Sequence, residues 1–599
     1  MSKISLAGYR FPEPASGVQV NFCKNIKCEA FGVPEALYRV RRPKNTSAKA
    51  GDYTRSPDSR GNIRMICGLC GSKNPLRSNE AVAQELNRLS AHIFDVTALC
   101  CPHETCSNHT APVTNPGSYV HNGKTPSGTP RWRCNICRKT FAGTAAPTAR
   151  QRKPHKNRDV FALLMNKMPM KRIAEVTGLA PSSVLGKIAL VHRQCVAFAG
   201  NREQQLVQGM ALPSVYIAVD RQVHNVNWSN RKDRRNVALT AIGSADLVSG
   251  YVFGFNLNFD PAMDADAVEK EAAANGDLAE YEAYRKYARI WLSTDYIAAV
   301  AASKVRKSKS KSKRYKTADF EEGLEQDITA QYEQTQTRED IEAADASTDT
   351  VLPSQGVQIK DQYTMHGHFH LLATLLHNAE KVRCYMDQDS GMRAAFLGAF
   401  AERVKQRTAD AWFISVMKDS TITQKEVAVN MAKARLDEAV AAHPELKLDA
   451  VKVLLMLEEM ANPKEIGEYG DVWLSHPVPN MSEPAKKMCW LTDLGDYDEK
   501  HQARLYLKAS LHSIDRFFMQ ARRRLSMAER SIATASAANR TWYGYSAYHP
   551  ESLARILEIF RVFYNYCKPG EDKQTPAMRL GLAKAPIALE DILYFQSGD

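Results

Sequence analysis

The run Ser214-Val215-Tyr216-Ile217-Ala218-Val219-Asp220 decides the fold of this chain, because it is short, apolar and ended by an acid. A second run, Val382-Arg383-Cys384-Tyr385-Met386-Asp387, ends in the same way. Short apolar runs bounded by polar residues are typical of buried strands. Two acids at the C-terminal ends of strands can converge across a sheet and bind a divalent metal ion. Asp220 and Asp387 are therefore candidate metal ligands.

The segments around these runs predict a mixed α/β domain. We expect strands at 215–220, 237–244 and 249–257, then, after an interruption, a helix at 365–379, a strand at 381–387, a helix at 391–406 and a strand at 411–417. Three consecutive strands followed by alternating helix and strand give the element order of an RNase H-like core. In that order one acid ends the first strand and another ends the fourth, which are the places of Asp220 and Asp387.

A third acid is expected on a later helix, predicted at 501–530 from its broad apolar face. Asp515 lies beside that face and is our choice. Glu529 is the alternative, but fourteen residues separate the two, about 21 Å along one helix, so both cannot bind one metal pair. Asp389 is likewise the second choice to Asp387.

Three carboxylates suit metal-dependent phosphoryl transfer. Two divalent ions about 3.5–4 Å apart can clamp the attacking and leaving oxygens of an in-line displacement. Carboxylate oxygens favour Mg²⁺, or Mn²⁺ in its place. We therefore expect two Mg²⁺ or Mn²⁺ ions at Asp220, Asp387 and Asp515.

Nine of the thirteen cysteines lie in the first 137 residues, and eight of them form a repeated pattern. Each module has one pair separated by four residues and one separated by two, which matches the turns that deliver four thiolates to zinc. The first predicted zinc site is Cys23, Cys28, Cys67 and Cys70, and the second is Cys101, Cys106, Cys134 and Cys137. In the second site Cys100, His103, His109 or His121 is an alternative ligand.

Residues 158–193 predict a helix-turn-helix. A short helix closes at Gly178, and Ala180-Pro181-Ser182-Ser183-Val184 opens another with Ser182 as its cap. This geometry places a recognition helix in the major groove of DNA. The predicted DNA contacts here and in the basic run that precedes the helices are Lys153, Lys156, Ser182, Ser183 and Lys187.

The overall charge favours a polyanionic partner, because 80 Lys and Arg against 66 Asp and Glu give +14. Further predicted DNA contacts, near the candidate acids, are Arg231, Arg234 and Arg235, and Arg522, Arg523 and Arg524. The chain has no run of about 20 apolar residues and no apolar signal core near Met1. We therefore expect a cytoplasmic, nucleoid-associated protein that does not contact a membrane.

Two segments interrupt the expected core. The stretch 260–360 carries a basic run at Lys304–Lys316 and then an acidic run, and is either a solvated segment or a flexible arm for DNA phosphates. The stretch 420–500 is expected to be a helical insertion. The histidines His366, His368 and His370 are spaced by two on a helix, which does not place them on one face.

In these features the chain resembles prokaryotic insertion-sequence transposases that combine zinc ribbons, a helix-turn-helix and a DDE/DDD core. The resemblance rests on the two cysteine modules and on the segments 218–220, 385–389, 513–518 with 522–524, 564–566 and 575–581. It implies cutting at element ends and strand transfer into target DNA by a homodimer or higher assembly on double-stranded DNA. The family's usual third acid is Glu, whereas Asp515 gives a DDD set.

The expected organisation is multidomain, of α+β and α/β type. Its parts are zinc ribbons at 1–98 and 99–150, the helix-turn-helix at 151–205, the first part of the core at 206–419, the insertion at 420–500, and the catalytic helix with the C-terminal region at 501–599. The alternatives to a transposase are a zinc-dependent DNA-binding regulator derived from one, and a structure-specific nuclease without strand transfer.

Overall fold

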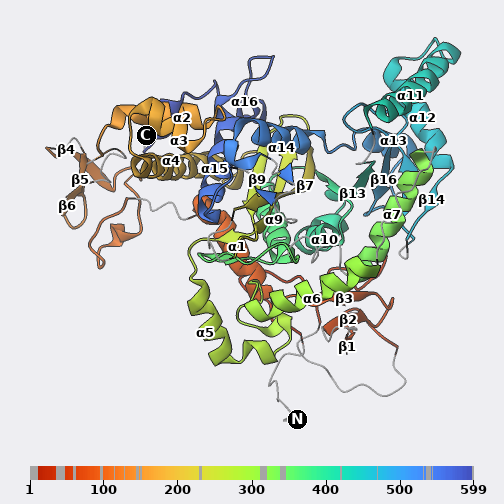
Figure 1. The fold of residues 1–599 in the computed structure, drawn as a ribbon, viewed down its shortest axis with the longest axis horizontal. Coiled ribbons are helices and arrows are strands. Elements are labelled where there is room, and N and C mark those ends of the chain that lie inside the picture. Colours follow the sequence, from red (N-terminus) through yellow and green to blue (C-terminus); the bar gives the residue numbers. More distant parts are fainter. Residues whose placement is uncertain are drawn as a thin grey trace.

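A mixed sheet organises the chain, which is a multidomain α/β protein (Figure 1). The computed structural model describes residues 11–35, 47–57, 63–94, 99–113, 115–126, 129–142, 148, 151–227, 233–309, 320–337, 346–417, 421–467, 470–529, 532–533, 541–542 and 544–596. Across the sheet the strands are β14 (Lys464–Glu465), β15 (Val472–Ser475), β16 (Lys486–Trp490), β13 (Ala409–Val416), β12 (Val382–Asp387), β7 (Val215–Val226), β8 (Val237–Asp246) and β9 (Val252–Leu257).

The strands at the centre of the sheet run in both directions. β7, β8 and β9 form an antiparallel meander, whereas β12 is parallel to β7 and β13 is parallel to β12. β16 then pairs antiparallel with β13. The sequence prediction for β7 was wrong at its end, because the strand continues past Asp220 to Val226. Beyond Asp220 buried and more exposed positions alternate, so the continuous apolar run that marks the first half of the strand is lost there.

Helices cover both faces of the sheet. α13 (Glu499–Leu507) and α14 (His512–Arg524) lie on one face, where the hydroxyl of Tyr385 donates to the carbonyl oxygen of Leu505 at 3.1 Å. α9 (Asp361–Leu375) and α10 (Ser390–Lys405) lie on the other. On that side a Cβ on Gly254 would stand 2.8 Å from the ring of His368.

The single helix expected at 501–530 is wrong, because residues 508–511 separate α13 from α14 and α14 ends at Arg524. The break has a tertiary cause. The buried carboxylate of Glu483 accepts from the backbone N–H of Leu511 at 2.6 Å and from the hydroxyl of Ser510 at 2.8 Å. Lys486 also donates to the carbonyl oxygen of Ala509 at 2.6 Å. These groups satisfy backbone atoms that a continuous helix would pair internally.

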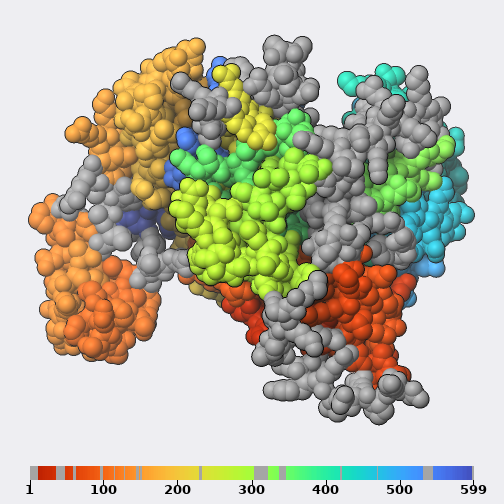
Figure 2. Space-filling view, turned by 60° about the horizontal axis from the view of Figure 1, so that its bottom comes forward, coloured from red at the N-terminus to blue at the C-terminus, as the bar shows by residue number. Residues whose placement is uncertain are grey.

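The N-terminal region consists of two small sheets and a linking helix. β1 (Tyr53–Pro57), β2 (Ile63–Cys67) and β3 (Lys73–Pro75) form one antiparallel sheet, and β4 (Tyr119–Lys124), β5 (Pro130–Cys134) and β6 (Thr140–Ala142) form the other. They lie far apart, with β4–β6 at the left end and β1–β3 at the lower right in both views (Figures 1 and 2).

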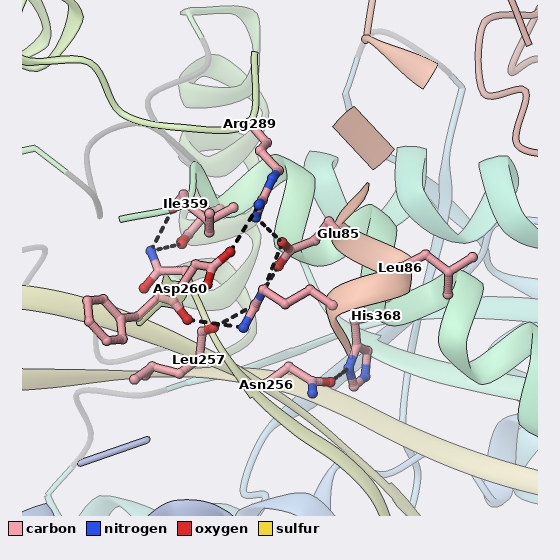
Figure 3. A network of polar contacts seen from close by, with 12 residues as sticks. Glu85, Leu86, Asn256, Leu257, Asp260, Arg289, Ile359 and His368 are labelled. Atoms are coloured by element: carbon pink, nitrogen blue, oxygen red, sulfur yellow. Dashed lines mark hydrogen bonds and ion pairs between the residues drawn. The ribbon is translucent and has the colours of Figure 1, made fainter. Parts of the chain in front are cut away.

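Between the two small sheets, α1 (Asn79–Phe94) is anchored to the core through a buried polar network (Figure 3). Fully buried Glu85 pairs with Arg88 at 2.6 Å and with Arg289 at 3.0 Å. Arg289 pairs in turn with Asp260 at 3.0 Å, and Arg88 donates to the carbonyl oxygen of Leu257 at 3.1 Å. Because each charge has a partner, this network can remain buried and fix α1 against β9.

The two insertions carry regular structure. The first contains α5 (Ala265–Asn275), α6 (Ser293–Lys309) and α7 (Phe320–Thr337). The basic run therefore begins within α6, and its part at 310–316 lies outside the described residues. The second was only half correctly predicted as helical. α11 (Ile422–Ala442) and α12 (Leu448–Ala461) are followed by β14, β15 and β16, which extend the central sheet.

The C-terminal region packs against the meander. α15 (Pro550–Val562) leads into a π-helix at Phe563–Cys567, then α16 (Pro576–Leu580) and α17 (Leu589–Leu593). Asn565 exchanges two hydrogen bonds with the backbone of Val252, each 2.9 Å long. Short pairs are formed by β10 (Phe259–Asp260) with β11 (Val357–Gln358), and β17 (Ile532–Ala533) with β18 (Thr541–Trp542). Over the described residues no single helix is long and apolar enough to cross a membrane, although the bent pair α3 (Met170–Thr177) and α4 (Pro181–Val207) meets that test when taken together.

Candidate functional site

Two clusters of four cysteines lie where the sequence predicted them. Cys23, Cys28, Cys67 and Cys70 form one, and Cys101, Cys106, Cys134 and Cys137 form the other. In the described part of the chain, these are the groups of three or more Cys, His, Asp or Glu whose ligand atoms all lie within 4.8 Å of one another. The cysteine ligand sets chosen from the sequence are thus confirmed as groups compatible with zinc.

The sulfur positions fit a tetrahedral zinc ion. Such an ion, with bonds of about 2.3 Å, separates its sulfur ligands by roughly 3.8 Å. The Sγ–Sγ distances are 3.5 Å for Cys23–Cys70, 3.9 Å for Cys28–Cys67, 3.3 Å for Cys101–Cys137 and 3.7 Å for Cys106–Cys134. Cys100 is outside the set, and the ring of His121 instead packs edge-on against Trp132. His109 is hydrogen-bonded through Nδ1 to the carbonyl oxygen of Cys101 at 2.8 Å.

A tyrosine at equivalent places in the two modules was missed in the sequence. The hydroxyl of Tyr53 accepts from the backbone N–H of Cys23 at 3.1 Å, and that of Tyr119 accepts from Cys101 at 2.9 Å. Each hydroxyl also donates to a backbone carbonyl oxygen in the loop that follows the first cysteine of its module. The acceptor is Ala30 or Val33 for Tyr53, and Asn108 or Ala111 for Tyr119. Each tyrosine precedes its CxxC pair by a similar interval, which is the signal that was available. The two modules are therefore structural duplicates.

The acids Asp220 and Asp387 lie side by side on neighbouring strands. Met386 of β12 is in register with Val219 of the parallel strand β7, so Asp387 follows one step on, beside Asp220. Neighbouring strands are about 4.8 Å apart, and residues in register point to the same face. Tyr385, two residues before Asp387, points toward α13, so both acids are on the face that α13 and α14 cover.

Helix α14 brings Asp515 over the same face. Gly243 is directly opposite Asp220 on β8, and a Cβ on it would stand 2.7 Å from both Ile514 and Phe518. Asp515 is exposed in the first turn of α14. Arg522 is two turns further along and therefore on the same side of the helix. The carboxylates of Asp220, Asp387 and Asp515 do not form a cluster as close as the cysteine sets.

The contacts of Arg522 position that helix face above β7. In the amide orientation that satisfies both side chains, the oxygen of buried Gln222 accepts from Nε and Nη2 of Arg522, each at 2.6 Å. Gln222 is two residues after Asp220 and therefore on the same face of the sheet. This contact could not be predicted from the sequence, since a polar residue within a strand gives no pattern of its own.

Both alternative acids are already engaged elsewhere. Asp389 is the N-cap of α10, where it accepts from Gly391 at 2.7 Å and from Met392 at 3.2 Å, and it is also paired with Arg221. Arg221 holds a second acid, Asp361 of α9, at 2.9 Å, so this group lies on the face away from Asp220.

Glu529 follows the end of α14 and pairs with Lys167 at 3.1 Å. The distance of about 21 Å along one helix, used to exclude it, therefore does not apply, because the helix ends at Arg524.

Three helices follow the second cysteine module. They are α2 (Asn157–Leu164), α3 (Met170–Thr177) and α4 (Pro181–Val207), and α3 and α4 meet at 106° around Gly178, whose φ is 65°. This angle is typical of a helix-turn-helix. The predicted cap was wrong by two residues, because Ala180 is the N-cap and Pro181 takes the first helical position. Ser182 and Ser183 are exposed in the first turn.

Of the basic residues chosen from the sequence, some are at the surface and others are not. Lys153 is exposed, and Lys156 is half-buried beside Asp159 at 3.6 Å. The prediction that Lys187 contacts DNA was wrong. Its ammonium is buried and donates to Asn157 at 2.6 Å and to the carbonyl oxygen of Lys153 at 2.9 Å, and burial lowers its pKa. It joins α4 to the preceding turn and is not available to DNA.

The three arginines at the end of α14 also differ in their exposure and contacts. Arg523 is exposed, whereas Arg522 binds Gln222 and Arg524 donates to the carbonyl oxygen of Met165 at 3.3 Å. Because the backbone N–H of Lys167 donates to Arg524 at 2.7 Å, this end of α14 is joined to the turn between α2 and α3. Arg522 and Arg524 thus have internal roles.

In the turn after β7, Arg234 is exposed and Arg235 pairs with Asp233 at 2.6 Å, while Arg231 lies outside the described residues.

Comparison with protein family models, with curated proteins and with solved structures finds no match to this chain. Its site therefore has to be interpreted from its own geometry.

Proposed function

We propose that the chain is a DNA transposase that cuts element ends and transfers the strands to target DNA with Asp220, Asp387 and Asp515 as its catalytic acids. The observation that carries this proposal is the register of β7 and β12, which sets Asp220 beside Asp387 on the face covered by α14. Adjacent carboxylates repel one another, and an arrangement that holds them together is typical of a cation site.

The order of the central strands supports an RNase H-like core. Strands β9, β8, β7, β12 and β13 are adjacent in that order, with an antiparallel meander followed by two parallel strands. Numbered along the chain this is the order 3-2-1-4-5, in which the first and fourth strands are neighbours. An acid on each of these two strands can therefore face one site.

The three acids are carried by different structural elements in the proposed reaction. Asp220 and Asp387 would hold Mg²⁺ or Mn²⁺ from the rigid sheet, and Asp515 would complete the set from α14. Bound ions would supply Lewis-acid activation of water or a 3′-hydroxyl and would stabilise the departing 3′-oxygen. Arg522 and Gln222 fix the position of α14 and thereby of Asp515.

The remaining modules supply DNA binding in this proposal. The exposed first turn of α4, with Ser182 and Ser183, suits the major groove, and Lys153 is near it in sequence for contact with phosphates. The cysteine modules would be zinc ribbons. A homodimer or larger assembly would hold two DNA ends together, and the net charge of +14 favours such a polyanionic partner.

A cleavage and joining assay tests the proposal. The zinc-loaded chain is incubated with Mg²⁺ or Mn²⁺ and labelled duplexes taken from both ends of the DNA segment that encodes it. We expect cut and joined strands with the wild type and a loss of about a hundredfold or more in each of Asp220→Asn, Asp387→Asn and Asp515→Asn, since even outer groups of metal sites are worth 10–100-fold.

Matched variants separate the alternatives. Asp266→Asn changes an exposed acid of α5, far along the chain from the acids, and should cut normally. Loss of activity in Glu529→Gln but not in Asp515→Asn would reassign the third acid. Cutting without joining would point to a nuclease, and DNA binding with no cutting to a regulator. Wild-type rates in Asp220→Asn would contradict the proposed site.

A further inference from the structure

A cavity of about 740 Å³ lies between the first cysteine module, α7, α9 and the start of α10. It is separate from the proposed catalytic face, because Phe413 of β13, which lines it, is in register with Met386 and so faces away from Asp387. Five of its described lining residues are Lys or Arg, and none is Asp or Glu. A wall with this charge attracts anions.

Two groups in its wall are buried and have no hydrogen-bond partner among the described residues. They are Nζ of Lys24 and Nδ1 of His366. Nζ of Lys24 stands 3.6 Å from the ring centre of Phe22, which accepts no conventional hydrogen bond, and burial holds the pKa of Lys24 well below its usual range. The side chain of His366 is 4% exposed. An unpartnered buried polar group is costly, so either group would gain from a hydrogen-bonding ligand that reaches it.

His366 has a perturbed pKa in this cavity. Burial, followed by the neighbouring Lys24 and Arg77, holds the pKa of His366 well below its usual range. The imidazole is therefore neutral and can form a hydrogen bond without adding charge. Arg393, on α10, is held in place by Asp471 at 2.7 Å. Arg64 and Lys73 approach from β2 and β3.

The size and remaining lining narrow the ligand class. A volume near 740 Å³ is far larger than a single phosphate and is in the range of sites for small organic molecules. The rings of Tyr332 and Phe413 offer flat apolar surface, and Asn25 and Asn74 offer amide groups for the edge of a base.

We propose that this cavity binds a nucleotide through its phosphate, with Arg64 and Lys73 around the phosphate. The nucleotide is either free or the 5′-phosphorylated end of a DNA strand. This inference does not depend on the proposed transposase activity, because it concerns the opposite face of the sheet.

Calorimetric titration of the full zinc-loaded chain tests the proposal. The probes are dAMP, inorganic phosphate, and a short thymidine oligonucleotide with either a 5′-phosphate or a 5′-hydroxyl. The double variant Arg64→Gln/Lys73→Gln should weaken binding at least about tenfold, because it removes two charge-assisted hydrogen bonds to the phosphate. Ala394→Phe keeps every charge but narrows the cavity, and should weaken binding.

Lys27→Gln is the matched control, since Lys27 is exposed in the same module and does not line the cavity. Zinc content and thermal unfolding establish that each variant is folded. Binding of dAMP that both variants weaken supports a free nucleotide. Binding of the 5′-phosphorylated oligonucleotide alone supports a strand end. Absence of binding by every probe, or equal affinity in wild type, Ala394→Phe and the double variant, would overturn the proposal.

Discussion

The buried carboxylate of Glu203 gives the sharpest stability prediction. Glu203 is on α4 and accepts from Arg561 of α15 at 2.5 Å, from Tyr251 at 2.7 Å and from His92 of α1 at 2.9 Å. Glu203 has no exposed surface, and Arg561 is 2% exposed. One side chain therefore joins the long helix that carries the proposed DNA-reading turn to the rest of the protein.

The change Glu203→Gln keeps the shape of the side chain and removes its charge. Burial alone would raise the pKa of Glu203, but Arg561 and His92 outweigh it and lower the pKa from 4.5 to about 2. A fall of the pKa from 4.5 to about 2 corresponds to roughly 3 kcal/mol of stability at neutral pH. The loss expected from breaking a buried ion pair is about 3–5 kcal/mol, which agrees.

The expected pH dependence follows from the direction of this shift. Because the folded-state pKa is below the unfolded-state value, the stabilisation is fully present above about pH 4.5. It is lost as the pH falls through the interval from about 4.5 to about 2. The difference between wild type and Glu203→Gln should therefore be largest at neutral pH and should shrink on acidification.

Hydrogen exchange measured on peptides of α4 and α15 is the suitable assay, since a multidomain chain does not unfold in one step. Glu558→Gln is the matched control. Glu558 pairs with the same Arg561 at 2.8 Å but is 23% exposed, so its loss should cost about 1 kcal/mol or less. Equal effects of the two variants, or a penalty for Glu203→Gln that is unchanged at low pH, would refute the reasoning.

Three further predictions concern metal content, helix packing and the turn at Arg138. The folded chain should contain two zinc ions by elemental analysis. The variant Cys70→Ala should retain one of them, because Cys70 belongs to the first cluster only. Retention of both ions by this variant would count against that ligand set. In thermal melts, Gly243→Val should destabilise the domain by about 1–3 kcal/mol, since a Cβ there would stand 2.7 Å from Ile514 and Phe518. It should also slow metal-dependent cleavage. The control Gly186→Ala, whose Cβ would have nothing within 4 Å, should be neutral or stabilising in the same melts. Arg138 has a φ of 60° at the place of Gly71 in the other module, so Arg138→Gly should raise the melting temperature of the second module, and a lower value would show that the arginine side chain matters more than its backbone strain.

Local spacing was enough to predict the cysteine clusters and the end of β12. A CxxC pair determines its own turn, and Asp387 is the last residue of a run buried on both sides. The same reasoning failed where the environment differs between the two faces of a strand. β7 continues beyond Asp220 because Gln222 and His224 are buried beneath α14, although their residue types suggest a loop.

Long-range contacts account for the other differences. Glu483 and Lys486 interrupt the helix expected at 501–530, and they are themselves on or beside strands that were expected to be helical. Lys187 was assigned to DNA from its place on the second helix of the motif. Its hydrogen bond to Asn157 shows that it faces inward.

The candidate site depends on a small residue as much as on its acids. Across the sheet, Asp387, Asp220, Gly243 and Phe255 form one row on the face that α14 covers. Phe255 packs against Phe517 and Phe518, with ring centres 5.0 and 5.5 Å apart, while Gly243 leaves room for Ile514. A larger residue at 243 would raise α14 from the sheet and move Asp515 away from the two strand acids. The absence of a side chain at Gly243 is therefore a condition for a third acid to come from this helix, and a glycine gives no sign of this in the sequence.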